Sequence, residues 1–292
     1  MELLFKMLRP DFLLHDALLG SVLVGSVCPL VGVYFVLRRM ILLGVALPQL
    51  SAAGIAFAFL VSRMILGERQ QGTMNAHSLA LAGSVAFTLT GIFLLAAFER
   101  RGREMVEARI GVSFAVAGAC TMLFLAADPS GEAQMVSLLK GDLLATTATS
   151  LTTLMGVLGV VVLILFVLRK EFLLVSFDRD LAVVFGRRAE FWDALLYLAI
   201  GVTIALGVTT AGPLVTFGFL VVPPVAARRV TRHMITFSLV AAGIGAVSAF
   251  AGFYCAYRFD VPLGPAEVAV ASMVLLVVSF GRGLGHALRG FA

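Results

Sequence analysis

Long apolar segments, separated by short polar ones, fill most of this sequence and limit what it can fold into. A helix of about 20 apolar residues crosses a hydrocarbon core about 30 Å thick. Because backbone inside lipid must satisfy its own hydrogen bonds, these segments predict an all-α, polytopic transmembrane helix bundle, with residues 1–292 as one transmembrane domain. We expect about nine spans, at residues 13–37, 40–65, 78–98, 106–127, 145–168, 194–210, 213–227, 234–257 and 263–280.

Smaller features interrupt this pattern. Residues 1–12 are expected to form a short interfacial helix, and residues 135–144 another short helix before the fifth span. The seventh span is short and contains Pro223 and Pro224, which are expected to interrupt it because proline lacks a backbone donor.

Composition supports a membrane protein and argues against an enzyme. Hydrophobic residues make up 60% of the chain and charged residues 13%, whereas a soluble domain has roughly a quarter charged. The alternating strand pattern of an outer-membrane barrel is absent. The sequence contains no GxxxxGK[ST] phosphate loop, no GxSxG elbow and no HExxH helix, so we expect no enzyme activity and no cofactor in this chain.

The basic residues predict the orientation. When the loops are assigned alternately to two sides, 16 of the 22 Lys and Arg residues fall on one side and 6 on the other. The positive-inside rule makes the richer side cytoplasmic, which places the N-terminus outside and the C-terminus inside. The net charge of +5 therefore reflects cytoplasmic arginines, and we expect membrane lipid and no nucleic acid as a partner.

The polar segment Arg169–Asp193 is the most highly charged stretch between two spans, and this orientation makes it cytoplasmic. Its apolar residues Leu181, Val184 and Phe185 recur at helical spacing. We therefore predict an amphipathic helix outside the bilayer, with Asp178 as its N-cap. The segment is either a solvated surface helix or a docking element for a cytoplasmic partner.

A few polar residues fall inside the predicted spans, where their burial in lipid is costly. Gln49 follows Pro48, which frees a carbonyl one turn earlier, near Gly44. The broken turn either lines a polar cavity or is a kink for packing. Glu267 falls early in the ninth span, near the outer interface, as a pathway residue or an interfacial one. No cluster of metal ligands is visible, so the metal-binding residues stay unassigned.

Other apolar-span residues have simpler interpretations. The cysteines Cys28, Cys120 and Cys255 form no CxxC pair and are interpreted as small buried hydrophobic residues. Small residues at near four-residue spacing in the eighth span allow close helix contact, either within one subunit or at a dimer interface. These residues are Gly243, Gly245, Ser248 and Gly252.

Five stretches together resemble the ABC-3 type permeases of zinc, manganese and iron importers. VYFVLRRMILLGVALPQLSAAGIA (33–56) is similar to FVVLRRMSLIGDALSHAVLPGIA, and FDRDLAVVFG (177–186) to FDEDLARASG. TTAGPLVTFGFLVVPPVAARR (209–229) resembles VGALLVTALLIIPAATAR, and KGDLLATT (140–147) resembles FGNILAVS. DVPLGPAEVAVASMVLLV (260–277) resembles D-x-PSGP-x-IVL-x-A. The matches occur in the family's order and span nearly the whole chain.

The resemblance implies the permease subunit of an ATP-binding-cassette importer in a bacterial-type cytoplasmic (inner) membrane. Such a permease pairs with a second permease, as a homodimer or a paired chain. Its other partners are a cytoplasmic ATPase dimer, which binds the ATP, and an extracytoplasmic solute-binding protein. The segment 169–193 would then couple to the ATPase through residues of the matched motif, namely Phe177, Asp178, Asp180, Leu181 and Gly186.

The sequence departs from the family motif at the expected cation site. In G-D-A-L-S-H-A, the Asp and His are four residues apart and share a helix face. Here the Asp falls at Val45 and the His at Gln49, and valine cannot bind a cation while glutamine is a weak, neutral ligand. We expect the substrate pathway at Val45, Pro48, Gln49 and Glu267.

This departure leaves more than one function open. The chain is expected to import a divalent metal ion or a metal complex. The alternatives are a membrane scaffold or assembly subunit that passes no free cation, or an importer of a non-metal solute. A stand-alone secondary transporter is disfavoured, since ion coupling needs centrally placed carboxylates that the spans lack.

Overall fold

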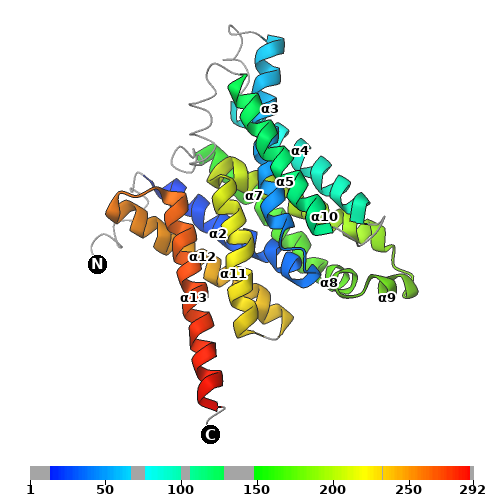
Figure 1. Ribbon diagram of the computed structural model, residues 1–292, viewed down its shortest axis with the longest axis vertical. Coiled ribbons are helices and arrows are strands. Elements are labelled where there is room, and N and C mark those ends of the chain that lie inside the picture. Colours follow the sequence, from blue (N-terminus) through cyan, green and yellow to red (C-terminus); the bar gives the residue numbers. More distant parts are fainter. Residues whose placement is uncertain (1–13, 67–75, 100–105, 128–147, 232, 290–292) are drawn as a thin grey trace.

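The computed structural model describes residues 14–66, 76–99, 106–127, 148–231 and 233–289, and this part of the chain contains eleven helices and no strand (Figure 1). Nine of these helices are long and apolar enough to cross a membrane, which confirms the predicted number of spans for the described residues. The helices are α2 (His15–Arg38), α3 (Leu43–Leu66), α4 (Ala76–Glu99), α5 (Val106–Ala126), α7 (Ala148–Val167), α8 (Arg169–Phe177), α9 (Arg179–Val184), α10 (Ala189–Ala211), α11 (Pro213–Val230), α12 (Met234–Phe259) and α13 (Leu263–Arg289).

Most helix ends lie within a few residues of the predicted ones. The exceptions are α10, which begins at Ala189 rather than at residue 194, and α13, which continues to Arg289 rather than ending at residue 280. Helix α10 begins earlier because Asp193 is buried in its first turns and paired with an arginine, so charge does not mark the helix boundary there. The helices predicted at 1–12 and 135–144, and the motif at 140–147, lie outside the described residues.

The predicted interruption of the seventh span is wrong, because α11 runs continuously from Pro213 to Val230. Pro223 and Pro224 are both buried within it. Proline at these positions removes the donors that would reach the carbonyls one turn earlier. One of these carbonyls, that of Leu220, lies against α2 at Gly32, where an added Cβ would be 1.9 Å from its oxygen. Close packing of α2 against this carbonyl thus stabilises α11 as a continuous helix at Pro223 and Pro224.

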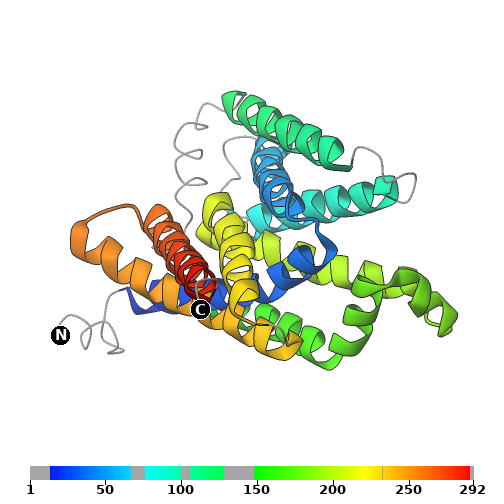
Figure 2. The same ribbon diagram turned by 60° about the horizontal axis from the view of Figure 1, so that its bottom comes forward.

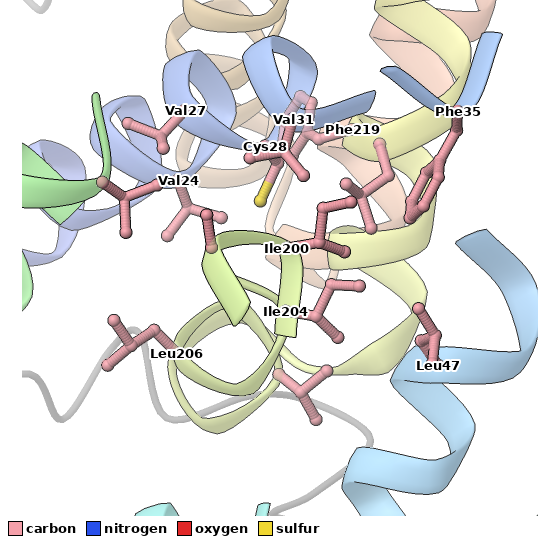
Figure 3. Close-up of a cluster of buried hydrophobic side chains, with 14 of the residues drawn as sticks. Val24, Val27, Cys28, Val31, Phe35, Leu47, Ile200, Ile204, Leu206 and Phe219 are labelled. Atoms are coloured by element: carbon pink, nitrogen blue, oxygen red, sulfur yellow. The ribbon is translucent and has the colours of Figure 1, made fainter. Parts of the chain in front are cut away.

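Helix α2 lies at the centre of the packing, in contact with α10, α11 and α12. Figure 3 shows one face of α2 directed at α10 and α11, with Cys28 among the apolar side chains, as interpreted from the sequence. The labelled residues of this cluster are Val24, Val27, Cys28, Val31, Phe35, Leu47, Ile200, Ile204, Leu206 and Phe219.

Small residues join α2 to α12, which run antiparallel side by side (Figure 2). A Cβ added at Gly245 would be 1.9 Å from the carbonyl oxygen of Gly25, so the two backbones are in direct contact. Gly252 makes a similar approach to Glu267 of α13, whereas Gly243 has open space around it. Of the two interpretations of the eighth span, packing within one subunit therefore explains Gly245 and Gly252.

Candidate functional site

The polar segment after the fifth span forms a bent arm made of α8, α9 and the turn into α10 (Figure 1). Asp178 separates the two short helices in an extended conformation, and its Oδ1 accepts a hydrogen bond of 2.9 Å from the Leu181 N–H. The predicted N-cap is thereby confirmed. Gly186 has a φ of +71°, a conformation that glycine adopts without strain, and it turns the chain back toward α10.

Four apolar residues of the arm, in and beside α9, are exposed. Val184 is 81% exposed and Phe177 67%, and Leu181 and Phe185 are exposed as well. The buried residue of α9 is Ala182, which packs with Val175 of α8 and Ala189 of α10. We call the exposed set the α9 surface: Phe177, Asp180, Leu181, Val184 and Phe185.

A buried polar network ties this arm to the transmembrane helices. The Arg38 Nη2 at the end of α2 donates to Asp193 Oδ1 of α10 at 2.7 Å. The same guanidinium donates to Ser176 Oγ of α8 at 3.1 Å and to the Tyr197 hydroxyl of α10 at 3.2 Å. The other carboxylate oxygen, Asp193 Oδ2, lies 3.5 Å from the Arg179 Nε at the start of α9. One arginine thus connects α2, α8 and α10, and its carboxylate partner extends the connection to α9.

Sequence reasoning did not identify Arg38 or Asp193 as functional residues. Both stand at the edges of apolar spans, where charges are common and need no special explanation. A separate ion pair, from Arg187 Nη2 to Glu171 Oε1 at 3.1 Å, joins the turn after α9 to α8. These pairs fix the position of the α9 surface relative to α2 and α10.

The structure brings Val45, Pro48 and Gln49 together on α3. Helix α3 continues through Pro48, from Leu43 to Leu66. Because proline has no N–H, Pro48 donates no hydrogen bond to the Gly44 carbonyl one turn earlier. Pro48 is buried, and Val45 and Gln49 are half-buried.

The Gln49 amide faces α5. Its nitrogen lies 3.6 Å from the place that a Cβ on Gly118 would occupy, so the absence of a side chain there leaves room for the amide. A different face of α3 carries Ser51, whose hydroxyl pairs with that of Ser84 on α4 at 2.5 Å. Ser84 in turn donates to the Ala205 carbonyl of α10 at 3.2 Å. This hydroxyl chain was not predicted, because serine in an apolar span carries little signal.

Glu267 lies in a different environment from Gln49. It is fully buried on α13, and its Oε1 accepts a hydrogen bond of 2.5 Å from the Ser21 hydroxyl of α2. Helix α11 packs against both α3 and α13. The four residues expected to form the pathway are therefore not one cluster. Within the described residues, no group of three or more His, Cys, Asp or Glu side chains is placed to hold a metal ion.

Comparison with known proteins identifies the family. A family model described as the ABC 3 transport family matches residues 11–282. The chain belongs to the ABC 3 transport family. This membership makes it a multi-pass membrane subunit of a transporter and not an enzyme, as the sequence motifs predict.

Named relatives of this ABC 3 chain cover most of its length. It is 25% identical to the manganese transport system membrane protein MntC of Listeria innocua, over 90% of this chain and 89% of the relative. It is 28% identical to the zinc transport system membrane protein TroC of Treponema pallidum, over 91% and 88%. Its fold matches the structure of PsaBC from Streptococcus pneumoniae in complex with Fab with a TM-score of 0.80 and 21% identity, over 95% and 94% of the two chains.

Proposed function

We propose that this ABC 3 family subunit carries a divalent metal ion or a metal complex into the cell, driven by ATP. The cargo is supported by the relatives named for manganese and zinc transport, which align with about nine-tenths of the chain. The direction is supported by the matched motifs, which are those of metal-uptake permeases. ATP is bound and hydrolysed by separate chains, since this one has no phosphate loop.

The assembly we propose has two permease chains in a bacterial inner membrane, an ATPase dimer on the cytoplasmic side and a solute-binding protein outside. The N-terminus lies outside and the C-terminus inside, so the arm is cytoplasmic. The main support for the proposed contact with the ATPase is the exposure of the α9 surface. A short capped helix that exposes Phe177, Val184 and Phe185 to water has a typical interface character, and Asp178 and Asp180 supply charge for a basic groove.

The coupling mechanism follows from the network behind this surface. When ATP binding closes the ATPase dimer, it moves α9. The Arg179–Asp193–Arg38 pairs transmit that movement to α10 and α2, because the three side chains are linked at 3.5 and 2.7 Å. ATP therefore biases the bundle between outward-open and inward-open states, which is a two-state coupling.

The substrate path in this proposal includes the α3 face that carries Val45, Pro48 and Gln49. A neutral amide and an apolar side chain bind free Zn²⁺ or Mn²⁺ weakly. The same observation favours a second candidate: a chain that passes a non-metal solute, or a scaffold subunit that passes no free cation.

The experiment is metal uptake by cells that express the chain with its ATPase and solute-binding protein. Cellular Zn, Mn, Fe and Co are measured by elemental analysis against an ATPase-dead control. An ATP-dependent rise in one metal supports the importer. If the complex assembles and no metal rises, the metal assignment is wrong, and chelates, organic solutes and the scaffold role are tested next.

A further inference from the structure

A buried carboxyl group with one unpaired oxygen lies where α2, α12 and α13 meet. Glu267 is 0% exposed, and its Oε1 accepts the hydrogen bond from Ser21, but its Oε2 has no partner. The hydroxyl oxygen of Ser248, also fully buried, has no partner either. Among the described residues these are the two buried side-chain polar atoms without a hydrogen bond. Leaving a buried carboxylate oxygen unpaired is unfavourable, so the state of Glu267 calls for a physical explanation.

The three polar residues stand at one level of the bundle. Gly25 of α2 contacts Gly245 and Ala249 of α12, so Ser21, one turn earlier on α2, faces the next turn of the antiparallel α12. That turn runs from Ser248 to Gly252. A Cβ on Gly252 would be 2.4 Å from the Glu267 Cα, so α13 is in direct contact there. Ser248 and Ser21 therefore lie on the two helices that enclose the Glu267 side chain.

Among the residues that the structure describes, no basic group pairs with Glu267. The titratable side chains on α2 near its start are His15 and Asp16, which pair with each other at 3.9 Å. Those in the last turns of α12 are Tyr254, Cys255, Tyr257 and Arg258, and α11 carries its arginines, Arg228 and Arg229, at the end of the helix. None of these groups is a partner of Glu267, whose one bonded oxygen is taken by Ser21.

A metal ion fits this place less well than a proton. Oxygen-bound cations need about six ligands, whereas the hydrogen-bonded side chains here supply two carboxylate oxygens and the hydroxyl oxygen of Ser21. Gly252 also lies against the Cα and Cγ of Glu267, which leaves little room beside this part of the side chain. The motif D-x-PSGP-x-IVL-x-A has isoleucine at the position of Glu267.

We propose that Glu267 and Ser21 form a proton-binding site in which the Glu267 carboxyl is held un-ionised in the folded chain. The proton resides on Oε2, while Oε1 continues to accept from Ser21. One proton is taken from water and none is passed on, so no charge remains buried. Ser248 lies on the neighbouring turn of α12 and makes no hydrogen bond to Glu267.

The site is close to one end of the bundle. Ser21, Gly252 and Glu267 lie within two helical turns of His15, Phe259 and Leu263, which is about 10 Å at 1.5 Å per residue. In the orientation expected from the arginines, this is the extracytoplasmic end. The proton then exchanges with the outside, and external pH controls how firmly α2, α12 and α13 are held together. This inference does not depend on the cargo of the transporter.

Infrared spectroscopy of the purified chain tests the proposal directly. At pH 7 we expect the carbonyl stretch of a buried, un-ionised carboxylic acid in the wild type. The band should disappear in Glu267→Gln and persist in Glu107→Gln, which removes an exposed carboxylate from α5. If Glu267→Gln does not fold, Glu267→Ile, the residue of the motif, takes its place. A wild type without this band, or a band that survives both Glu267 variants, overturns the proposal.

Thermal stability distinguishes a proton from another cation. If the folded chain holds a proton that the unfolded chain releases, the wild-type Tm falls as pH is raised from 6 to 9, and the Tm of Glu267→Gln does not. The same fall is expected in NaCl and in choline chloride. If Na⁺ or Mn²⁺ restores the wild-type Tm at pH 9 and leaves Glu267→Gln unchanged, the site binds that cation, and the proton assignment is wrong. Equal pH dependence in both proteins also overturns it.

Discussion

Arg38 and Asp193, which are 155 positions apart in the sequence, form a salt bridge of 2.7 Å where α2 meets α10. Their side chains are 11% and 10% exposed, so both charges are largely removed from water. Asp193 also faces Arg179 of α9 at 3.5 Å. A transmembrane helix and the exposed arm thus share one carboxylate. Replacing either arginine therefore changes the charge balance around Asp193, which is also the partner of the other arginine.

Removing one member of this pair is expected to destabilise the chain strongly. Arg38→Gln leaves Asp193 largely buried with the more distant Arg179 as its remaining partner, and breaking a buried pair costs about 3–5 kcal/mol. The matched control is Arg39→Gln, which removes a positive charge from the adjacent, exposed position. Thermal unfolding of the purified chain measures both variants. Equal Tm values for the two would show that the pair contributes little to stability.

Replacement of Val184 is expected to prevent docking of the ATPase without affecting the folding of this chain. Val184 is 81% exposed at the end of α9, so Val184→Asp removes no internal contact and should leave the Tm unchanged. The added charge is costly to bury in an apolar interface, so copurification of the ATPase should be lost. The control is Val184→Thr, which keeps the shape of the side chain. Normal ATPase copurification with Val184→Asp would exclude α9 as the contact.

Two substitutions of Asp178, the N-cap of α9, distinguish the effect of the cap from the effect of the charge. Asp178→Ala removes the acceptor for the Leu181 N–H, a loss of about 1 kcal/mol for an N-cap. Asp178→Asn keeps the cap and removes the charge. If the arm must be preordered, only the alanine variant uncouples ATP hydrolysis from transport; if the charge binds the ATPase, both variants weaken the complex. Substrate-stimulated ATPase activity that is normal in both would exclude a role for Asp178.

The parts of the fold that depend on local sequence were predicted well. Span length and hydropathy are local properties, and the Asp178 cap depends on a residue three positions away. The failures concern residues whose behaviour is decided by a distant helix. Pro223 and Pro224 do not interrupt α11 because Gly32 of α2 packs against the carbonyl of Leu220, a contact that no local rule contains.

The candidate site shows the same limit. The motif at 177–186 pointed to the arm, but the helical spacing of Leu181 and Val184 did not reveal that these residues are exposed and that Ala182 is the buried one. Arg38 and Asp193 were missed because their pairing exists only after α2 and α10 pack. Glu267 is visible in the sequence as a charge in a span, but its partner Ser21 lies 246 positions away, and no local pattern predicts that pair.

Two glycines on α12 are expected to respond oppositely to the same substitution. Gly245→Ala places a Cβ 1.9 Å from the Gly25 carbonyl oxygen, so α2 and α12 must move apart and the Tm should fall. Gly243→Ala meets nothing within 4 Å and should be neutral or stabilising by up to about 1 kcal/mol, since alanine favours helix. Thermal unfolding of both variants checks this. A similar loss of Tm at Gly243 would show that this face is also covered, for example by a second subunit.

Restoring the motif pair on α3 is expected to create a metal site. Val45 and Gln49 are four residues apart on one helix face and both are half-buried, so Val45→Asp with Gln49→His places a carboxylate and an imidazole side by side. These are ligands of Zn²⁺ and Mn²⁺. Metal bound per purified chain should rise, and uptake should rise in the full complex. Val45→Asp alone is the control, since one carboxylate binds weakly. A separate variant, Gln49→Leu, removes the amide and should abolish transport without preventing assembly. An assembled double variant with unchanged metal content and uptake would show that this face of α3 does not line the path.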